Sequence, residues 1–253
     1  MFLIFKKRAI LSAIIIALLF VMCFVGLGQT CAAEVYFGST LRKIPVYGVD
    51  TEEKVVAISF DAAWGADKTR GIIDIINKYE IKATFFLVGF WINKYQEEVK
   101  LISENGIEIG NHSDNHLKMS TLSEDEIRKE IVTVNESLKK ITGKDVKFFR
   151  PPFGDYNDKL INVLESLNMT TIQWSVDSLD WKGISGDEIT QRVVSRVKNG
   201  SIILCHNNSD HILDALPAII LNLKNKGFKF VTMSELVYEK DFYIDNNGIQ
   251  HKI

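Results

Sequence analysis

Six side chains able to do acid–base or metal chemistry follow apolar, β-branched runs of this sequence. Five of them come at the end of such a run: Asp61, His112, Arg150, Asp177 and His206. The sixth, His116, follows four residues after the first histidine. Parallel strands joined by helices bring their carboxyl ends to one rim, where sheets and barrels of this class keep their active sites. If the runs are such strands, the six groups gather at one rim, and the pattern predicts an enzyme.

Each of these residues also has an ordinary structural interpretation. The His112 and His116 imidazoles could face one side of a helical turn and bind a divalent metal, or they could be surface residues at a helix start. Asp61 could be a general base or metal ligand, or the N-cap of a helix. Arg150 could hold that carboxylate ionised, or form a surface ion pair. A lone histidine at a strand end, such as His206, is more often structural.

Other residues near the strand ends extend this set. Asp177 is followed by Asp180 and Trp181, which add an acid and an aromatic wall. A base, an acid, orienting partners and a two-histidine metal site together suit metal-assisted hydrolysis. Four further aromatic residues could line a sugar groove or serve helix packing: Trp64, Trp91, Tyr95 and Tyr156.

Strand and helix signals alternate along the body of the chain. Strands are predicted at 54–61, 83–89, 107–111, 147–152, 170–177, 201–206 and 228–232, and helices at 68–79, 123–141, 157–168, 186–198 and 210–226. Such alternation predicts a parallel, right-handed wound sheet or barrel. We therefore predict an α/β fold, a distorted and incomplete (β/α)7 barrel of mostly parallel strands, preceded by an N-terminal hydrophobic helix.

The N-terminus predicts export. Three basic residues at 6–8 precede an apolar stretch from Ala9 to about Leu27, and the small residues Cys31–Ala33 offer a cleavage site. The stretch is long for a signal peptide and nearly long enough to span a bilayer, so a cleaved leader and an uncleaved anchor both remain open. The predicted segments are a signal peptide or membrane anchor (1–33), an extension (34–51), a catalytic domain (52–240) and a tail (241–253).

Composition agrees with a soluble globular body. The hydrophobic fraction is 46% and the formal net charge is -2. That charge gives no electrostatic footprint for nucleic acid, so no nucleic-acid partner is expected. Cys205 lies in a buried-looking strand, and no internal disulfide framework is predicted.

The motifs resemble those of the polysaccharide deacetylases of carbohydrate esterase family 4, which remove acetyl groups from N-acetylated or O-acetylated glycans. The resemblance runs from about Val55 to Leu236 and comprises five ordered motifs. It implies that Asp61 is the general base that activates a metal-bound water. It also implies that His112 and His116 are metal ligands and that Arg150 orients the base.

The same resemblance assigns the leaving-group side of the site. His206 would be the general acid that protonates the leaving amine, and Asp177 would orient it. The backbone N–H of Phe153 would help to bind the oxyanion. Trp181 and Leu204 would wall the pocket for the acetyl methyl group. The family fold is a distorted (β/α) barrel.

One position departs from the family pattern. The second aspartate of the first motif, the third protein ligand of the metal, is Ala62 here. Two neutral histidines alone are expected to bind zinc or cobalt weakly or not at all, unless water, substrate or Asp114 takes the third place. The segment Ala62–Gly65 resembles the sporulation-associated branch from spore-forming bacteria.

Two functions follow from this pattern. The first is an exported hydrolase, membrane-anchored or secreted, that removes acetyl groups from N-acetylated glycan of the cell wall or spore envelope. Its partners would be cell-wall polysaccharide and, if the leader is uncleaved, the membrane. The second is a catalytically impaired protein that binds glycan in a structural role during sporulation. The retained acid and base favour the enzyme, whereas Ala62 favours the binder.

Overall fold

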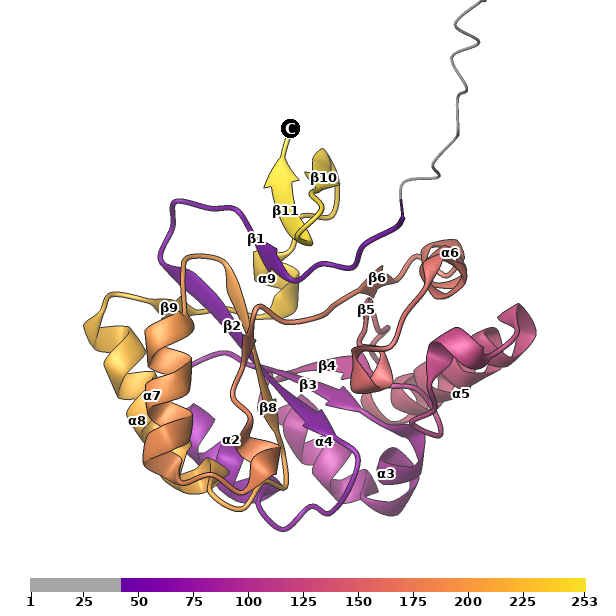
Figure 1. Ribbon diagram of the computed structural model, residues 1–253. Coiled ribbons are helices and arrows are strands. Elements are labelled where there is room, and N and C mark those ends of the chain that lie inside the picture. Colours follow the sequence, from indigo (N-terminus) through magenta and orange to yellow (C-terminus); the bar gives the residue numbers. More distant parts are fainter. Residues whose placement is uncertain (1–41) are drawn as a thin grey trace, which may run out of the picture. The chain divides into compact units, whose positions relative to one another are not determined.

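The computed structural model describes residues 42–253, whose centre is one curved, mostly parallel sheet (Figure 1). Its strands within that range are β1 Gly48–Val49, β2 Val55–Ala62, β3 Thr84–Leu87, β4 Glu108–Asn111, β5 Phe148–Phe149, β6 Thr170–Thr171, β7 Val176–Asp177, β8 Ser201–His206, β9 Lys229–Phe230, β10 Phe242–Ile244 and β11 Ile249–Lys252. They run in the order β10-β11-β1-β8-β2-β3-β4-β5-β6, with β7 beside β8 and β9 beside β2. The predicted α/β fold is confirmed.

Strands β2 and β8 form the middle of the sheet and pair in parallel. Their register places Asp61 opposite His206 at the carboxyl ends. Seven of the eight residues of β2 are buried, as expected for a parallel strand covered on both faces. The two predicted proton-transfer groups therefore lie on adjacent, tightly packed strands.

Helices cover the sheet between successive strands. They are α2 Thr69–Lys78, α3 Gly89–Lys94, α4 Gln96–Glu104, α5 Glu124–Thr142, α6 Asp158–Ser166, α7 Gly186–Arg196, α8 Ile212–Asn225 and α9 Met233–Leu236. The longest, α5, begins at a capping box formed by Ser123 and Glu126 and ends at Gly143, whose φ is 73°. Its start and stop signals are those that the sequence predicts.

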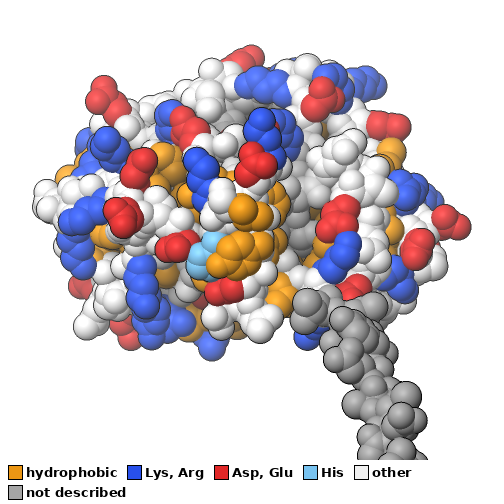
Figure 2. Space-filling view, turned by 90° about the horizontal axis from the view of Figure 1, so that it is seen from above, with side chains coloured by type: hydrophobic (Ala, Val, Ile, Leu, Met, Phe, Trp, Pro, Cys, Tyr) orange, Lys and Arg blue, Asp and Glu red, His pale blue; other side chains and the backbone are white. Residues whose placement is uncertain are grey.

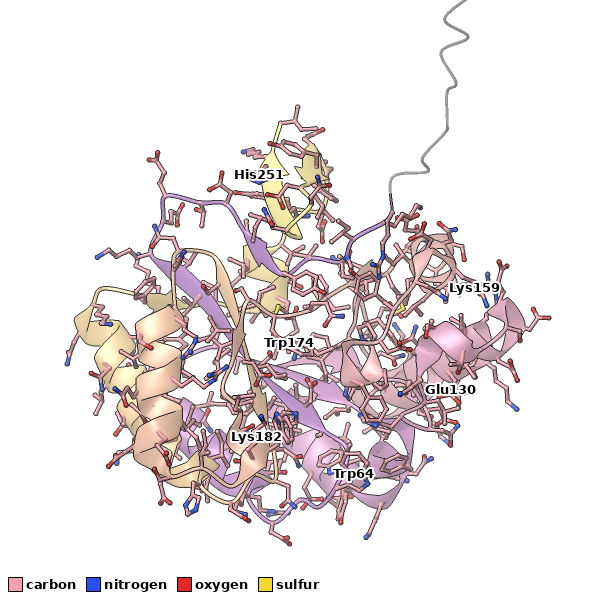
Figure 3. All side chains as sticks on the ribbon, in the orientation of Figure 1. Trp64, Glu130, Lys159, Trp174, Lys182 and His251 are labelled. Carbon is pink, nitrogen blue, oxygen red and sulfur yellow. The ribbon has the colours of Figure 1, made fainter. Side chains whose placement is uncertain are left out.

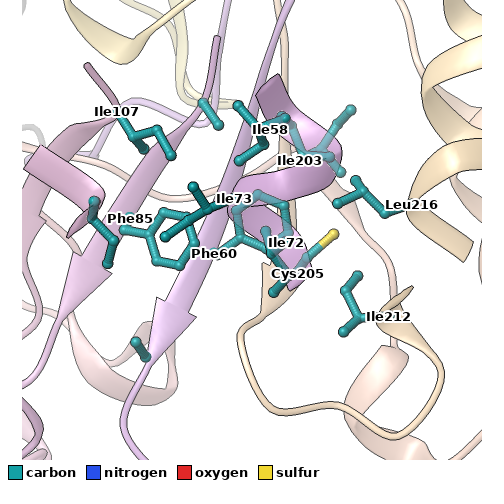
Figure 4. Packing of buried hydrophobic residues seen from close by; sticks show 14 of the residues in the cluster. Ile58, Phe60, Ile72, Ile73, Phe85, Ile107, Ile203, Cys205, Ile212 and Leu216 are labelled. Carbon is teal, nitrogen blue, oxygen red and sulfur yellow. The ribbon is translucent and has the colours of Figure 1, made fainter. Parts of the chain in front are cut away.

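A large apolar cluster joins the sheet to these helices (Figure 4). Phe60 of β2 and Phe85 of β3 lie with ring centroids 5.0 Å apart. Ile72 of α2 and Ile212 of α8 are fully buried in the same cluster. Cys205 is a free, buried thiol within it, and burial raises its pKa well above the ordinary value. The carboxyl ends of β2 and β8 are thus anchored by a rigid core.

The segments on either side of the predicted catalytic domain join the same sheet. β1 pairs in parallel with β11 and antiparallel with β8. The side chain of buried Gln250 accepts from Tyr238 N–H and donates to its carbonyl oxygen, each at 2.8 Å. Tyr243 stacks on His251 with ring centroids 4.9 Å apart, and Figure 2, which looks down on this end, shows hydrophobic side chains beside a histidine.

The single strand predicted at 170–177 is two short strands, β6 and β7, separated by Ile172–Ser175. The predicted leader and its hydrophobic helix lie outside the described residues. Within residues 42–253, no helix is long and apolar enough to cross a membrane.

Candidate active site

A pocket of about 680 Å³ opens at the carboxyl ends of the central strands. The sequence-predicted residues that line it are Asp61, His112, His116, Phe153, Asp177, Trp181, Leu204 and His206. Arg150 lies behind Asp61 and is fully buried. Figure 3 labels Trp64, Trp174 and Lys182, which mark this part of the molecule. The structure therefore brings the predicted rim residues together.

The predicted base, Asp61, forms a buried ion pair. Nη1 of Arg150 donates to Asp61 Oδ1 at 2.7 Å and to Ser59 Oγ at 2.9 Å. The guanidinium also stacks over the ring of Phe86, 4.1 Å from its centroid. Burial alone would raise the pKa of Asp61, but the Arg150 charge and the neighbouring histidines lower it below its ordinary value. Asp61 is therefore ionised at neutral pH and can accept a proton.

The predicted acid, His206, is held by a carboxylate through two contacts. Its Nδ1 lies 2.7 Å from Asp180 Oδ1, and its backbone N–H donates to Asp180 Oδ2 at 2.8 Å. Burial lowers the pKa of His206, but the hydrogen bond and charge of Asp180 outweigh this and raise it. The imidazole is thus biased toward the protonated form that an acid requires.

The prediction that Asp177 orients His206 is wrong. Asp177 Oδ1 instead accepts from the backbone N–H of Leu179 at 2.8 Å. Leu179 has a φ of 55°, and this left-handed turn leads into a short 3-10 helix, Asp180–Lys182, whose first residue meets His206. Sequence reasoning noted Asp180 in the same motif but could not foresee the turn, because leucine rarely adopts positive φ.

The two remaining histidines lie against each other at the pocket wall. Their ring centroids are 5.0 Å apart. His112 Nδ1 donates to the Arg150 carbonyl oxygen at 2.7 Å, which leaves Nε2 with a free lone pair, 3.5 Å from Asp61 Oδ2. Burial lowers the pKa of His112, and burial together with His112 lowers the pKa of His116 to about 4. Both imidazoles are neutral at pH 7.

The predicted helical turn at these histidines is wrong. His112 follows the end of β4, and the chain then forms a loop in which Ser113 and His116 both have positive φ, 65° and 54°. The Ser113 hydroxyl accepts from the His116 N–H at 3.0 Å and fixes this loop. The rings approach through loop geometry and not through helical spacing.

The donors near this pocket do not fit the three-ligand set of a catalytic zinc site. Ala62, at the third position, is fully buried and carries only a methyl group. Asp114 does not line the pocket, and its carboxylate packs against Gly89 at the start of α3. Among residues 42–253, no group of three or more His, Cys, Asp or Glu side chains could hold a metal ion. Within residues 42–253, this site therefore offers two imidazoles, with no carboxylate at position 62.

Exposed aromatic side chains surround the pocket mouth. Trp64 and Phe153 flank His116, with ring centroids 4.9 Å and 4.6 Å away. Trp181 also lines the pocket and is 58% exposed. Trp91, by contrast, is fully buried and donates from Nε1 to the Gly65 carbonyl oxygen. Of the four aromatic residues named above for a sugar groove, Trp64 lines the pocket.

Comparison with known proteins places a chain with this fold and pocket in the class of polysaccharide deacetylases. A family model described as polysaccharide deacetylase matches residues 48–172. The chain is 38% identical to a peptidoglycan-N-acetylglucosamine deacetylase of Bacillus cereus, over 72% of this chain and 67% of that protein. It is 32% identical to the peptidoglycan-N-acetylmuramic acid deacetylase PdaA of Bacillus subtilis, over 76% of this chain and 74% of that protein.

Solved structures agree. The structure of a CE4 family pseudoenzyme from Bacillus anthracis matches with a TM-score of 0.75 and 34% identity, over 83% of this chain and 73% of that one. The match to YlxY of Bacillus subtilis, an uncharacterized protein, spans 62% of that protein. The chain belongs to the polysaccharide deacetylases of carbohydrate esterase family 4.

Proposed function

We propose that this chain is an exported hydrolase that removes acetyl groups from N-acetylated cell-wall glycan, namely peptidoglycan of the wall or spore cortex. One observation carries the proposal: the Asp61–Arg150 pair and the His206–Asp180 pair meet across adjacent strands at one pocket. A pocket that only binds sugar needs neither an ionised base nor a charged acid with its own partner. The relatives named as peptidoglycan deacetylases support the substrate class.

The reaction follows from the protonation states. Ionised Asp61 takes a proton from a water molecule, whose oxygen attacks the acetamide carbonyl carbon. Arg150 holds the carboxylate in place, and the His112 Nε2 lone pair accepts a hydrogen bond from that water. His206 then gives its proton to the nitrogen as the C–N bond breaks, so that acetate and a free amine leave.

The remaining roles concern the acetyl group itself. The Phe153 N–H would donate to the oxyanion, and its φ of 60° sets the direction of the peptide at the pocket rim. Trp181 and Leu204 would enclose the methyl group. The donor set does not fit a three-ligand metal site, so the proton transfers proposed for this chain run between water, Asp61, His206 and the substrate.

A second function is favoured by one position. Ala62 stands where the family resemblance places a metal-binding carboxylate. A solved structure of similar fold is that of a CE4 family pseudoenzyme. A mutant of that Bacillus anthracis protein is described as having restored enzymatic activity. The alternative is therefore a catalytically impaired protein that binds wall or cortex glycan in a structural role.

Acetate release separates the two functions. The full chain, Asp61→Asn and Ala62→Asp would each be incubated with N-acetylated peptidoglycan, with zinc present and absent, and acetate would be measured enzymatically. If the native chain releases acetate and Asp61→Asn does not, the result supports the hydrolase. Release by Ala62→Asp alone, with glycan binding by the native chain, supports the binding role and refutes the hydrolase.

A further inference from the structure

Among residues 42–253, two glutamine side chains are buried, Gln173 and Gln250. Each directs its amide nitrogen to a backbone carbonyl oxygen. Gln250 Nε2 donates to the Tyr238 carbonyl oxygen at 2.8 Å, far from the pocket in sequence and on the segment after α9. Gln173 Nε2 donates to the Gly154 carbonyl oxygen at 3.0 Å. Because Gly154 directly follows Phe153, Gln173 ties the proposed oxyanion-binding turn to the sheet.

Gln173 lies where the sheet is interrupted between β6 and β7. Its backbone N–H donates to the Val46 carbonyl oxygen at 2.7 Å. Its backbone carbonyl oxygen accepts from Arg150 Nη2 at 3.2 Å. The backbone of this residue therefore contacts the cation that holds the base, while its side chain contacts the turn that carries the proposed oxyanion donor.

The turn needs support from outside itself. Phe153 and Gly154 have consecutive positive φ angles of 60° and 67°, and this region is unfavourable for phenylalanine. The carboxylate of Asp155 accepts from the Ser120 N–H at 2.8 Å and anchors the end of the turn. The amide of Gln173 anchors its middle. Without that donor, the partly buried Gly154 carbonyl oxygen would lose its partner, and the turn would be less firmly held.

We propose that Gln173 is a positioning residue for deacetylation, because its amide holds the Phe153–Gly154 turn with the Phe153 N–H directed at the developing oxyanion. The inference rests on the proposed hydrolysis and adds a residue that does not itself line the pocket. Preorganised donors aid catalysis because they need no rearrangement as charge develops. A loosened turn therefore slows the chemical step more than it weakens substrate binding.

The two buried glutamines give a crossed experiment. Gln173→Met and Gln250→Met each keep most of the side-chain volume and remove the donor. Hydrogen exchange of the full chain, followed by mass spectrometry, reports on the turn through the Gly154 N–H, which donates to the Pro151 carbonyl oxygen at 3.1 Å. It reports on the second site through the Tyr238 N–H, which donates to Gln250 Oε1 at 2.8 Å.

Exchange in the turn should become about tenfold or more faster in Gln173→Met and change less than about twofold in Gln250→Met, whose own effect should fall at Tyr238. If Gln173→Met does not fold, Gln173→Asn replaces it, because its amide is one methylene too short to reach Gly154. Unchanged exchange in the turn of the Gln173 variant, or equal acceleration in both variants, would overturn the proposal.

A substrate pair separates positioning from a loss of folded protein. Release of free amine would be measured from N-acetylglucosamine oligomers and from their N-thioacetyl analogues. Sulfur accepts hydrogen bonds weakly, so a well-placed N–H favours the oxygen substrate. The ratio of the two kcat/KM values is independent of the amount of folded enzyme. It should fall about fivefold in Gln173→Met, with kcat lowered and KM nearly constant, and stay within about twofold in Gln250→Met. An unchanged ratio in an active Gln173→Met would refute the role.

The outcomes also distinguish this inference from the function on which it rests. If the native chain releases no amine, but exchange in the turn accelerates only in the Gln173 variant, the hydrolase fails and the positioning of the turn by Gln173 stands. If the native chain is active, but Gln173→Met changes neither the exchange nor the ratio, the hydrolase stands and the role of Gln173 is refuted.

Discussion

Replacing Arg150 by methionine tests whether the buried pair holds Asp61 in its ionised state. The guanidinium is fully buried, and Asp61 is 6% exposed. Methionine retains much of the side-chain volume and can still pack over Phe86, so the substitution removes charge and hydrogen bonds more than packing. What remains is a buried carboxylate without its cation.

The size of the effect follows from those contacts. Removing one partner of a buried ion pair costs about 3–5 kcal/mol of unfolding free energy, because the other charge is left uncompensated. The hydrogen bonds from Arg150 to Ser59 Oγ and to the Gln173 carbonyl oxygen add roughly 1 kcal/mol each. We therefore expect a loss of about 5–7 kcal/mol of unfolding free energy at pH 7.

The pH dependence has a definite sign. In the native chain the pKa of Asp61 is lowered from 3.8, so its contribution to stability is present above pH 3.8 and is lost as pH falls through the folded-state pKa. Without Arg150, burial raises the pKa of Asp61 above that of the unfolded chain. The folded variant then binds the proton more readily, and its deficit relative to the native chain shrinks between pH 7 and pH 5.

Urea unfolding followed by tryptophan fluorescence at both pH values measures these differences. The double variant Asp61→Asn/Arg150→Met should recover about 2 kcal/mol or more, because no charge remains buried. Lys147→Met is the control, since its ion pair with Glu239 is exposed and should contribute less than about 1 kcal/mol. A loss below about 1 kcal/mol for Arg150→Met, or no recovery in the double variant, would refute the reasoning.

Two further outcomes are expected. Asp180→Asn should lower the pKa of His206, because it removes the charge and hydrogen bond that raise it, and NMR titration of the imidazole would measure the change. In calorimetry, zinc affinity should rise roughly tenfold or more in Ala62→Asp, and His116→Ala in that background should abolish the gain.

Matched variants sharpen both outcomes. Asp177→Asn removes a carboxylate from the same pocket but not from the imidazole contact, so it should move the His206 titration much less than Asp180→Asn does. An equal shift in both would mean that general pocket charge, and not the direct contact, sets the pKa. Ala62→Ser supplies no anionic ligand and should leave zinc affinity unchanged; a gain equal to that of Ala62→Asp would remove the ligand interpretation.

Sequence patterns predicted the regular part of this site. Apolar runs located β2 and β8, and parallel pairing then required Asp61 and His206 to share one edge. The two predictions that failed, the contact of Asp177 with His206 and the helical turn at the histidines, concern segments outside regular secondary structure. Positive φ at Leu179 and His116 redirects the chain after a strand, and hydrophobic periodicity carries no information about such turns. The partner of the acid and the approach of the histidine rings depend on those turns.

The packing of Ala62 bears on how the two proposed functions should be weighed. Its side chain is fully buried and belongs to the same apolar cluster as Leu87 and Val88, while its carbonyl oxygen accepts from the Val88 N–H. Position 62, where the family resemblance places the third metal ligand, is therefore part of the packed apolar core and does not leave an empty space at the pocket. A new carboxylate there must either turn toward the histidines or lose hydration inside an apolar cluster. Ala62→Asp should accordingly be less stable than the native chain without zinc and regain stability with it, because metal binding would then offset the cost of placing the charge.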